Sequence, residues 1–501
     1  MPKLLFLLIL IPVCGLASDT TVVKKSDSIR VSAEAYALVS EKPYSPFWIN
    51  SNRNGDFSET SASHALAKAD FSWRKNVAKK IALSTGIGAL SDLSSYHQLQ
   101  QAYAEISFRS FYLVAGRKIN TGYNQPATSS GMLGISNNAL PIPKVGFYMS
   151  DYENIPFTKG FAQFKAGFLH GWLGENETYI KDAYLHEKSL FIKFGANKPV
   201  DITIGLQHFA EWGGTDPVTN KELPQDIKAF WQVVRVKFKP SGTNASFINE
   251  YLNRIGNHVG TWNFGLNYKQ PNYIFSAFYN MPFEDGSGSK FWQNKDFLAG
   301  IQLRMKNASI IKEVSVELLS TLWQSGPGLP DTVFGENHGY RYGGRDDYYN
   351  NYLYKEGWTY NGRVLGTPLF ITRQKALLWG VPLSKFDSNQ TVVNNRVRAL
   401  HIGIKGSFKN YFGYRVLATF TKNYGTYFAL YEGRWKGIFT NPDFDYTFNP
   451  PLNQNYFLFE INKDITNRWN LIFSGGLDTG EMTNNFGMII GTRYNFLNGK
   501  N

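Results

Sequence analysis

Alternation of apolar and polar side chains at every second residue is the feature that most restricts how this chain can fold. In residues 261–269, Trp262, Phe264, Leu266 and Tyr268 alternate with polar residues and glycine. A period of two is typical of a β-strand that has one apolar face and one face in water. Similar segments recur along the chain, which predicts an all-β protein.

We count about eighteen such segments, each about ten residues long, which is the length of a strand that crosses a membrane at a tilt. Their expected starts are Ile29, Ala65, Lys80, Gln98, Phe111, Val145, Gly160, Ala183, Val200, Val259, Asn272, Phe297, Ile311, Arg396, Tyr411, Asn455, Arg468 and Asn485.

The connectors between these segments are sorted by length. The even-numbered connectors are all short, whereas the long ones, notably 210–257, 324–395 and 422–454, are all odd-numbered. Bacterial outer-membrane barrels have short periplasmic turns and long external loops. The sequence therefore predicts a transmembrane antiparallel β-barrel in the outer membrane of a Gram-negative bacterium, with both termini in the periplasm.

Composition agrees with a barrel. No apolar stretch beyond Val13 is long enough to span a bilayer as a helix, and the mean hydropathy is −0.30. Aromatic residues make up 16% of the chain. Because only helices and closed barrels satisfy every backbone group in lipid, a membrane protein of this composition must cross with strands.

Residues 1–17 are typical of a signal peptide, with Lys3 before an apolar core and a small-residue cleavage pattern at 15–17. We expect residues 18–28 to form a short periplasmic segment and residues 29–501 to form the barrel. A lipoprotein cysteine at Cys14 is the alternative, although Val13 is an unfavourable neighbour for one. Cys14 is the only cysteine, so cleavage after it leaves a chain without disulfide or thiolate chemistry.

The net charge of +13 indicates anionic partners only weakly, because basic residues also line lumens and flank membranes. Export argues against nucleic acid, which leaves outer-membrane lipids such as lipopolysaccharide and acidic glycans. The ending of the last strand, Gly491-x-x-Tyr494-x-Phe496, resembles the signal that the barrel assembly machinery reads. Five residues follow Phe496, however, where many barrels end on the aromatic residue.

A short helix is expected in one long connector. Residues 224–234 start with a proline and carry Ile227, Phe230, Trp231 and Val234 at helical spacing. Such a helix would fold over the barrel mouth as a lid; the alternative is one more strand.

No pattern of an enzyme, metal site or cofactor site is present. The chain lacks His-Glu-x-x-His and Gly-x-Ser-x-Gly, and His208 with Glu211 would supply only two ligands for zinc. Asp346 and Asp347 would make an acid/base pair in principle, but adjacent aspartates are more often solvated or bonded to sugar hydroxyls. We therefore expect no catalysis, no metal and no cofactor.

Residues 339–366, within the longest loop, combine aromatic rings with planar polar groups. Aromatic faces stack on the C–H faces of sugars, and Asn, Asp and Arg hydrogen-bond their hydroxyls. A second, weaker candidate surrounds Gly213 and Gly214, where a structural anchor is the favoured reading. For the main loop, glycan contact and packing of the loop into a plug are weighed about evenly. The candidate polysaccharide-binding residues are Tyr340, Arg341, Tyr342, Arg345, Asp346, Asp347, Tyr348, Tyr349, Tyr354, Trp358, Tyr360, Arg363, Trp212 and Trp231.

Five stretches together resemble the capsule assembly proteins of the Wzi family, particularly its Bacteroidetes versions. They are residues 46–52 (PFWINSN), 130–144 (SGMLGISNNALPIPK), 185–190 (LHEKSL), 205–214 (GLQHFAEWGG) and 358–369 (WTYNGRVLGTPL). The resemblance implies an eighteen-stranded outer-membrane lectin with an occluded lumen, which retains capsular polysaccharide at the cell surface without catalysis. The N-terminal helical bundle of the best-known members is absent or reduced here, because a strand is expected from Ile29.

Two other functions remain open. A porin or sugar channel would use the wide barrel as a pore, and inward-facing Lys193, Lys269, Arg304 and Lys405 would favour anions. An outer-membrane hydrolase of glycans or lipid A is the weaker alternative.

Overall fold

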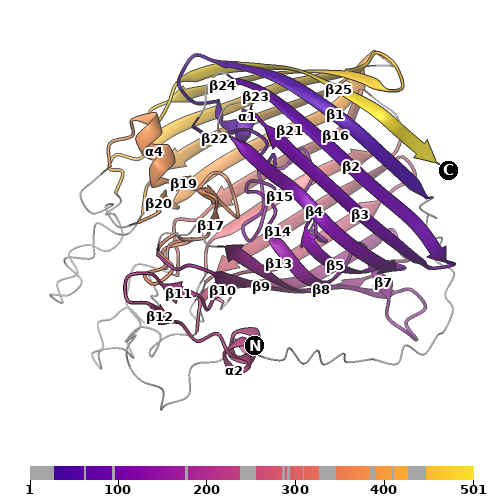
Figure 1. The fold of residues 1–501 in the computed structure, drawn as a ribbon, viewed down its shortest axis with the longest axis horizontal. Coiled ribbons are helices and arrows are strands. Elements are labelled where there is room, and N and C mark those ends of the chain that lie inside the picture. The colour runs from indigo at the N-terminus through magenta and orange to yellow at the C-terminus, as the bar shows by residue number, and fades with distance from the viewer. Residues whose placement is uncertain are drawn as a thin grey trace.

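Eighteen antiparallel strands close into one barrel in the computed structural model of the chain (Figure 1). The structure describes residues 27–60, 64–92, 96–123, 125–174, 179–236, 255–284, 288–289, 291, 294–307, 310–325, 346–383, 390–408, 411–426 and 447–500. The predicted signal peptide and most of the short segment after it lie outside these residues. The barrel is closed by β1 and the last strand, β25, where Ala35 is the register partner of Thr492.

All eighteen strands were predicted, and each expected start lies within three residues of an observed one. The short β7 (Glu153–Asn154) continues the edge of β6 along β8 and adds no separate crossing. The strands are β1 (Ser28–Ser40), β2 (His64–Ala78), β3 (Ile81–Ser91), β4 (His97–Phe108), β5 (Phe111–Arg117), β6 (Pro143–Met149), β8 (Ala162–Gly174), β9 (Ala183–Phe194), β10 (Val200–Trp212), β13 (Asn257–Lys269), β14 (Tyr273–Phe283), β15 (Phe297–Met305), β16 (Ile311–Ser320), β21 (Val397–Phe408), β22 (Phe412–Asn423), β23 (Leu452–Asp464), β24 (Trp469–Gly480) and β25 (Asn485–Lys500).

The two ends of the barrel differ in their connectors. At one end, which we call the short-turn end, two residues join β2 to β3 and two join β4 to β5. The other end, the long-loop end, carries connectors 213–256 and 321–396. These long connectors contain the short strands β11 (Thr215–Asp216), β12 (Lys221–Glu222), β17 (Thr359–Tyr360), β18 (Arg363–Val364), β19 (Ile371–Thr372) and β20 (Val392–Asn394), and the helices α2 (Ile227–Arg235) and α4 (Arg373–Trp379).

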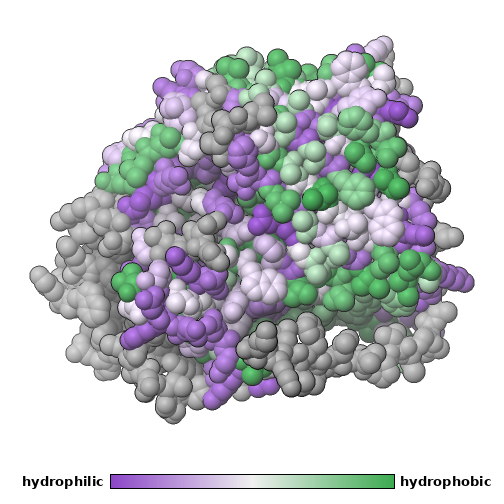
Figure 2. All heavy atoms as spheres, in the orientation of Figure 1, coloured by the Kyte–Doolittle hydropathy of each residue, from purple (hydrophilic) through white to green (hydrophobic). Residues whose placement is uncertain are grey.

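The wall is apolar outside and polar inside, the reverse of a soluble protein. Ile202 and Ile204 of β10 are exposed on the outer face, whereas Asp201 and Gln207 are buried on the inner face. Apolar side chains gather over the strands, and polar ones gather over the long-loop end (Figure 2). Among the described residues, no helix is long and apolar enough to cross a membrane.

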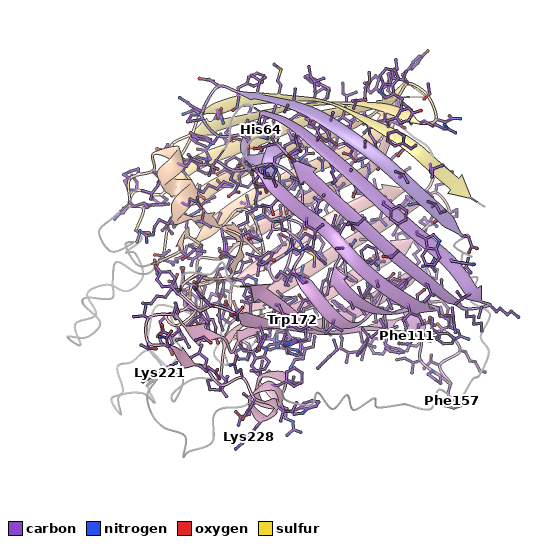
Figure 3. All side chains as sticks on the ribbon, in the orientation of Figure 1. His64, Phe111, Phe157, Trp172, Lys221 and Lys228 are labelled. Atoms are coloured by element: carbon purple, nitrogen blue, oxygen red, sulfur yellow. The ribbon has the colours of Figure 1, made fainter. Side chains whose placement is uncertain are left out.

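Helix α2 forms where the sequence predicts it, but the prediction that it covers the mouth is wrong. Its Ala229 and Val233 pack against Ala210 and Trp212, which have the same strand parity as the exposed Ile202 and therefore belong to the outer wall. Lys228 projects from the helix outside the barrel (Figure 3). The small side chains of its buried face fit closely against this wall, while other loops already fill the mouth.

The last strand explains the residues that follow Phe496. β25 continues to Lys500 and pairs there with Ser28 at the start of β1. Tyr494 and Phe496 face outward, with ring centroids 5.0 Å apart. The extra residues therefore extend the seam that closes the barrel.

Candidate functional site

Three loops fold into the lumen at the long-loop end and pack against one another. We call their described residues, 41–60, 118–123, 125–142, 346–383 and 390–396, the plug. They share one hydrophobic core, in which Trp48 and Phe57 of the first loop meet Leu133 and Leu140 of the second and Trp358 of the third. The core is continuous with inward-facing residues of the wall, so the plug and the barrel form one packed unit.

The first loop is held by the short helix α1 (Phe47–Asn50). Phe47 stacks on Tyr456 of β23 at 4.0 Å between centroids, and its backbone N–H donates to Asp478 of β24 at 2.9 Å. Trp48 Nε1 donates to Thr419 Oγ1 of β22 at 3.0 Å. One turn of helix is thus anchored to three neighbouring strands.

The second loop is anchored by polar groups of the inner wall. Thr128 Oγ1 donates to Glu313 at 2.6 Å, and the Ser130 backbone N–H donates to Glu317 at 2.8 Å. His401 Nε2 lies 3.0 Å from the carbonyl oxygen of Thr128. Glu317 is buried, and the bonds from Ser130 satisfy its carboxylate, whereas Glu313 also pairs with Arg304 at 3.4 Å.

The third loop closes over the second through aromatic side chains. Trp358 Nε1 donates to the carbonyl oxygen of Gly134 at 2.7 Å. The Tyr349 hydroxyl donates to the carbonyl oxygen of Leu133 and accepts from the Thr367 backbone N–H at 3.1 Å. A Cβ at Gly366 would overlap the Tyr349 hydroxyl, so this approach requires glycine.

One carboxylate inside the plug is paired with two cations. Glu59 lies 3.0 Å from Lys375 Nζ and 3.7 Å from Arg363 Nη1. Burial acts to raise the pKa of Glu59, but these two cations outweigh it and hold the pKa below its usual value. The remaining Arg363 donors reach the carbonyl oxygens of Asn50 and Phe57, which ties the third loop to the first.

Asp296, just before β15, is a buried acid with the opposite shift of its pKa. Burial raises its pKa to about 6, although the backbone N–H groups of Trp323 and Gln324 and the hydroxyl of Tyr348 donate to it and lower the pKa. The carboxyl therefore holds the start of the third loop against the barrel rim.

The structure brings together most of the described candidate residues, but inside the plug. Trp358 is 1% exposed, and a sugar cannot stack on such a ring without displacing the plug. Asp346 accepts from Ser325, and Asp347 accepts from Asn395 at 2.6 Å, so both carboxylates take part in loop packing. Glycan contact by these side chains stays a prediction. The buried aromatic and arginine candidates are Tyr348, Tyr349, Tyr354, Trp358, Tyr360 and Arg363; Tyr340, Arg341, Tyr342 and Arg345 lie outside the described residues.

The second predicted binding site, Trp212 with Trp231, lies on the outer wall of the barrel and on α2. Trp212 is buried beneath α2 on the outer wall, while Trp231 is 45% exposed on the helix itself. Phe230 links the two, with its ring 5.8 Å from Trp212 and 5.4 Å from Trp231. This cluster attaches α2 to the wall, in agreement with the interpretation of this region as a structural anchor.

Zinc binding by His208 and Glu211 is incompatible with their strand parity. His208 faces outward and lies 2.9 Å from His258, whereas Glu211 faces inward and accepts from Asn257 at 3.3 Å. Within the described residues, no group of three or more His, Cys, Asp or Glu is placed to hold a metal ion.

Exposed rings at the long-loop end were missed by the sequence reasoning. Tyr179 and Tyr352 are each 46% exposed, and Lys355 Nζ lies 5.6 Å from the Tyr179 ring centroid. The Tyr179 backbone N–H donates to Glu356, so Tyr179 is tied to the plug. We call Tyr179, Tyr352 and Lys355 the rim residues. Tyr352 lies inside the aromatic loop, but sequence alone does not separate exposed rings from buried ones.

A closed barrel with an apolar outer wall and a lumen filled by its own loops defines a plugged outer-membrane β-barrel. The family model described as capsule assembly protein Wzi matches residues 26–380. The chain belongs to this family, as its sequence motifs predicted.

One solved structure supports the same fold. Wzi of Escherichia coli, described as an outer membrane protein involved in group 1 capsule assembly and as a carbohydrate-binding β-barrel, matches with a TM-score of 0.54 and 12% identity, over 92% of this chain and 83% of that chain. OccAB2 of Acinetobacter baumannii matches with a TM-score of 0.47 and 9% identity, over 94% and 98% of the two chains. No curated protein matched the chain.

Proposed function

We propose that this protein binds capsular polysaccharide at its long-loop end and helps to assemble or retain the capsule at the cell surface, without catalysis. The long-loop end faces outward in this proposal, since external loops of such barrels are the long ones. One observation carries it: three loops are joined by a common core into a closed, hydrogen-bonded surface at that end. The barrel therefore holds this loop surface in a fixed shape, and we infer the polysaccharide ligand from family membership.

The rim residues are the contacts that we propose for the glycan. Tyr179 and Tyr352 are each 46% exposed, and Lys355 adds a positive charge beside the Tyr179 ring. Rings stack on sugar C–H faces, and a cation attracts the carboxylates of acidic glycans. The buried rings of the plug fix the shape of this surface. Single contacts are weak, so retention depends on many repeats of the polymer meeting many barrels.

Titration of purified capsular polysaccharide against the detergent-solubilised barrel tests this proposal. Tyr179→Ala with Tyr352→Ala is expected to weaken binding at least tenfold. The matched control is Tyr411→Ala with Tyr494→Ala, which removes two exposed tyrosines at the short-turn end and is expected to bind like the wild type. Equal binding by all three proteins would refute the rim as the contact surface, and no binding by the wild type would refute the function.

A further inference from the structure

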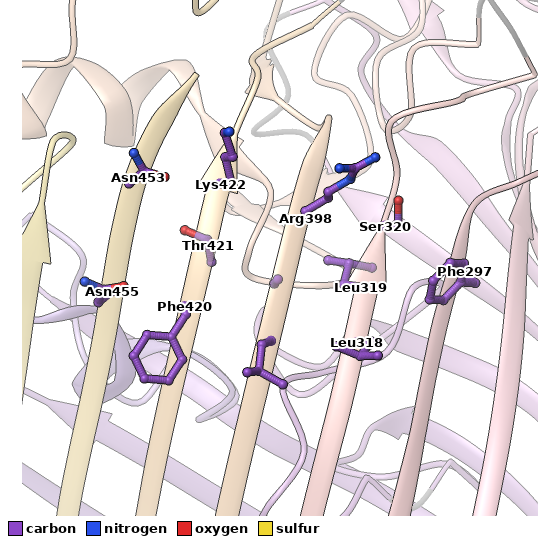
Figure 4. Close-up of a pocket in the computed structure, with 12 residues that line it drawn as sticks. Phe297, Leu318, Leu319, Ser320, Arg398, Phe420, Thr421, Lys422, Asn453 and Asn455 are labelled. Carbon is purple, nitrogen blue, oxygen red and sulfur yellow. The ribbon is translucent and has the colours of Figure 1, made fainter. Parts of the chain in front are cut away.

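A shallow hollow of about 630 Å³ lies on the outer wall near the long-loop end, across β15, β16, β21, β22 and β23 (Figure 4). Leu318, Leu400 and Phe420 line it and are exposed on the lipid-facing side. This hollow is separate from the plug and from the rim residues.

The register of the strands arranges the lining in two rows. In the upper row, Arg398 has Ser320 and Lys422 as its register partners, and Lys422 has Asn453 as its next partner. In the row below, Leu318, Leu400 and Phe420 occupy the corresponding positions. Figure 4 shows the charged side chains near the upper ends of their strands and Phe420 below them. A polar, cationic row thus lies above an apolar one.

Arg398 and Lys422 lie side by side, and none of the described residues that line the hollow is acidic. Like charges directly opposite each other on neighbouring strands destabilise a sheet. The acid at the end of this row, Glu481, accepts from the backbone and side-chain nitrogens of Asn453. An anion from outside the protein would relieve the repulsion between Arg398 and Lys422.

The height of this row matches the outer boundary of the membrane. At the short-turn end, Phe408 stacks on Phe412 with 5.8 Å between ring centroids. Phe408 and Tyr411 are exposed, as in an aromatic girdle. Arg398 lies ten residues along β21 from Phe408. At about 3.4 Å per residue and a tilt of about 40°, this separation is about 26 Å, close to the roughly 25 Å apolar band of such barrels.

We propose that this hollow binds the headgroup of a phosphorylated, acylated sugar of the outer leaflet, the chemistry of lipid A, with a phosphate between Arg398 and Lys422. Arg supplies planar paired donors for phosphate oxygens, and Lys supplies a point charge. Ser320 and Asn453 flank the phosphate with groups that hydrogen-bond sugar hydroxyls. An acyl chain lies over Leu400 and Phe420. The site depends on the outward orientation of the long-loop end but not on capsule binding.

Lipid retention by the purified full-length barrel tests this site. The barrel is placed in phosphatidylcholine nanodiscs that contain bisphosphorylated lipid A or its dephosphorylated form, and bound lipid is counted by native mass spectrometry. Wild type is expected to retain the phosphorylated form at least tenfold better than Arg398→Ala with Lys422→Ala. The control, Arg30→Ala with Lys463→Ala, removes two exposed cations near the short-turn end and should retain it like the wild type. Arg398→Lys with Lys422→Arg should also retain it.

Equal retention by the alanine pair, or equal retention of dephosphorylated lipid A, would overturn the proposal. A third outcome is that inorganic phosphate displaces the bound lipid A while the barrel shows no preference for an acylated ligand. That result would reveal a site for anions only and would also overturn the proposal. Folding of each variant is checked by the heat-dependent shift of the barrel on gel electrophoresis. If the double variant fails to fold, Arg398→Gln and Lys422→Gln are measured singly, and unchanged retention by both contradicts the site.

Discussion

Replacing Trp358 with alanine is expected to loosen the plug while leaving the barrel folded. The indole is buried, donates to the Gly134 carbonyl oxygen at 2.7 Å and lies 6.2 Å from the Phe209 ring. Truncating a buried tryptophan costs about 3–5 kcal/mol, because packing is lost and a cavity remains. At about 1.4 kcal/mol per tenfold change, the open population of the plug should rise by about two to three and a half orders of magnitude. Trp358 belongs to no strand of the barrel, so the wall keeps its hydrogen bonds.

Single-channel recording in planar bilayers measures this opening. The wild type is expected to stay closed, whereas Trp358→Ala should give frequent openings, and amide hydrogen exchange across 346–383 should accelerate. Trp231→Ala, which truncates an exposed indole on the outer wall, is the control and should stay closed. Quiet recordings and unchanged exchange in Trp358→Ala would refute the reasoning that this core holds the plug. Steady open current in the wild type would instead favour the anion-channel alternative.

Three further changes probe separate parts of the structure. Gly366→Ala places a Cβ against the Tyr349 hydroxyl and 2.6 Å from the Leu133 carbonyl oxygen. The plug should therefore lose about 1–3 kcal/mol of stability, measured by hydrogen exchange. The control is Gly475→Ala, which has open space around its Cβ and should change little. Asp296 has its pKa raised from 3.8 to about 6, so the stability it contributes is present below about pH 4 and is lost as the pH rises through 6. Its share should make the plug about 1 kcal/mol more stable to exchange at pH 5 than at pH 8, and Asp296→Asn should reduce the difference between these two pH values by that amount. Asp226 accepts from the Ala229 backbone N–H at 2.7 Å and so caps α2. Asp226→Ala should therefore cost α2 about 1 kcal/mol of stability and speed its hydrogen exchange. An equal effect of Lys228→Ala on the same helix would show that loss of the cap is not the cause.

The barrel could be predicted from sequence because its signals are local. Alternation such as that of 261–269 reports which side of a strand faces lipid, and connector lengths report which end each loop occupies. Both depend only on neighbouring residues, so strand number and starts follow without any tertiary information.

A plug was one of two open interpretations of the aromatic loop, but its contacts could not be predicted, because they join distant parts of the chain. Tyr349 bonds to Leu133, 216 residues away, and nothing near Tyr349 shows that its ring is enclosed whereas that of Tyr352 is exposed. Helix α2 poses a similar difficulty. Its apolar spacing predicts that Ile227, Phe230, Trp231 and Val234 form the buried face. The structure instead buries Ala229 and Val233 against the outer wall and leaves Ile227 and Trp231 exposed. The pair Arg398 and Lys422 emerges only when the register between β21 and β22 is known.

Sedimentation of capsular polysaccharide with liposomes that carry the purified barrel tests the central claim most directly. The polysaccharide is expected to sediment with the liposomes when the long-loop end faces outward, and its chain length is expected to stay unchanged after incubation. Polysaccharide that stays in the supernatant would contradict the proposed binding, and polysaccharide shortened by the pure protein would contradict a function without catalysis.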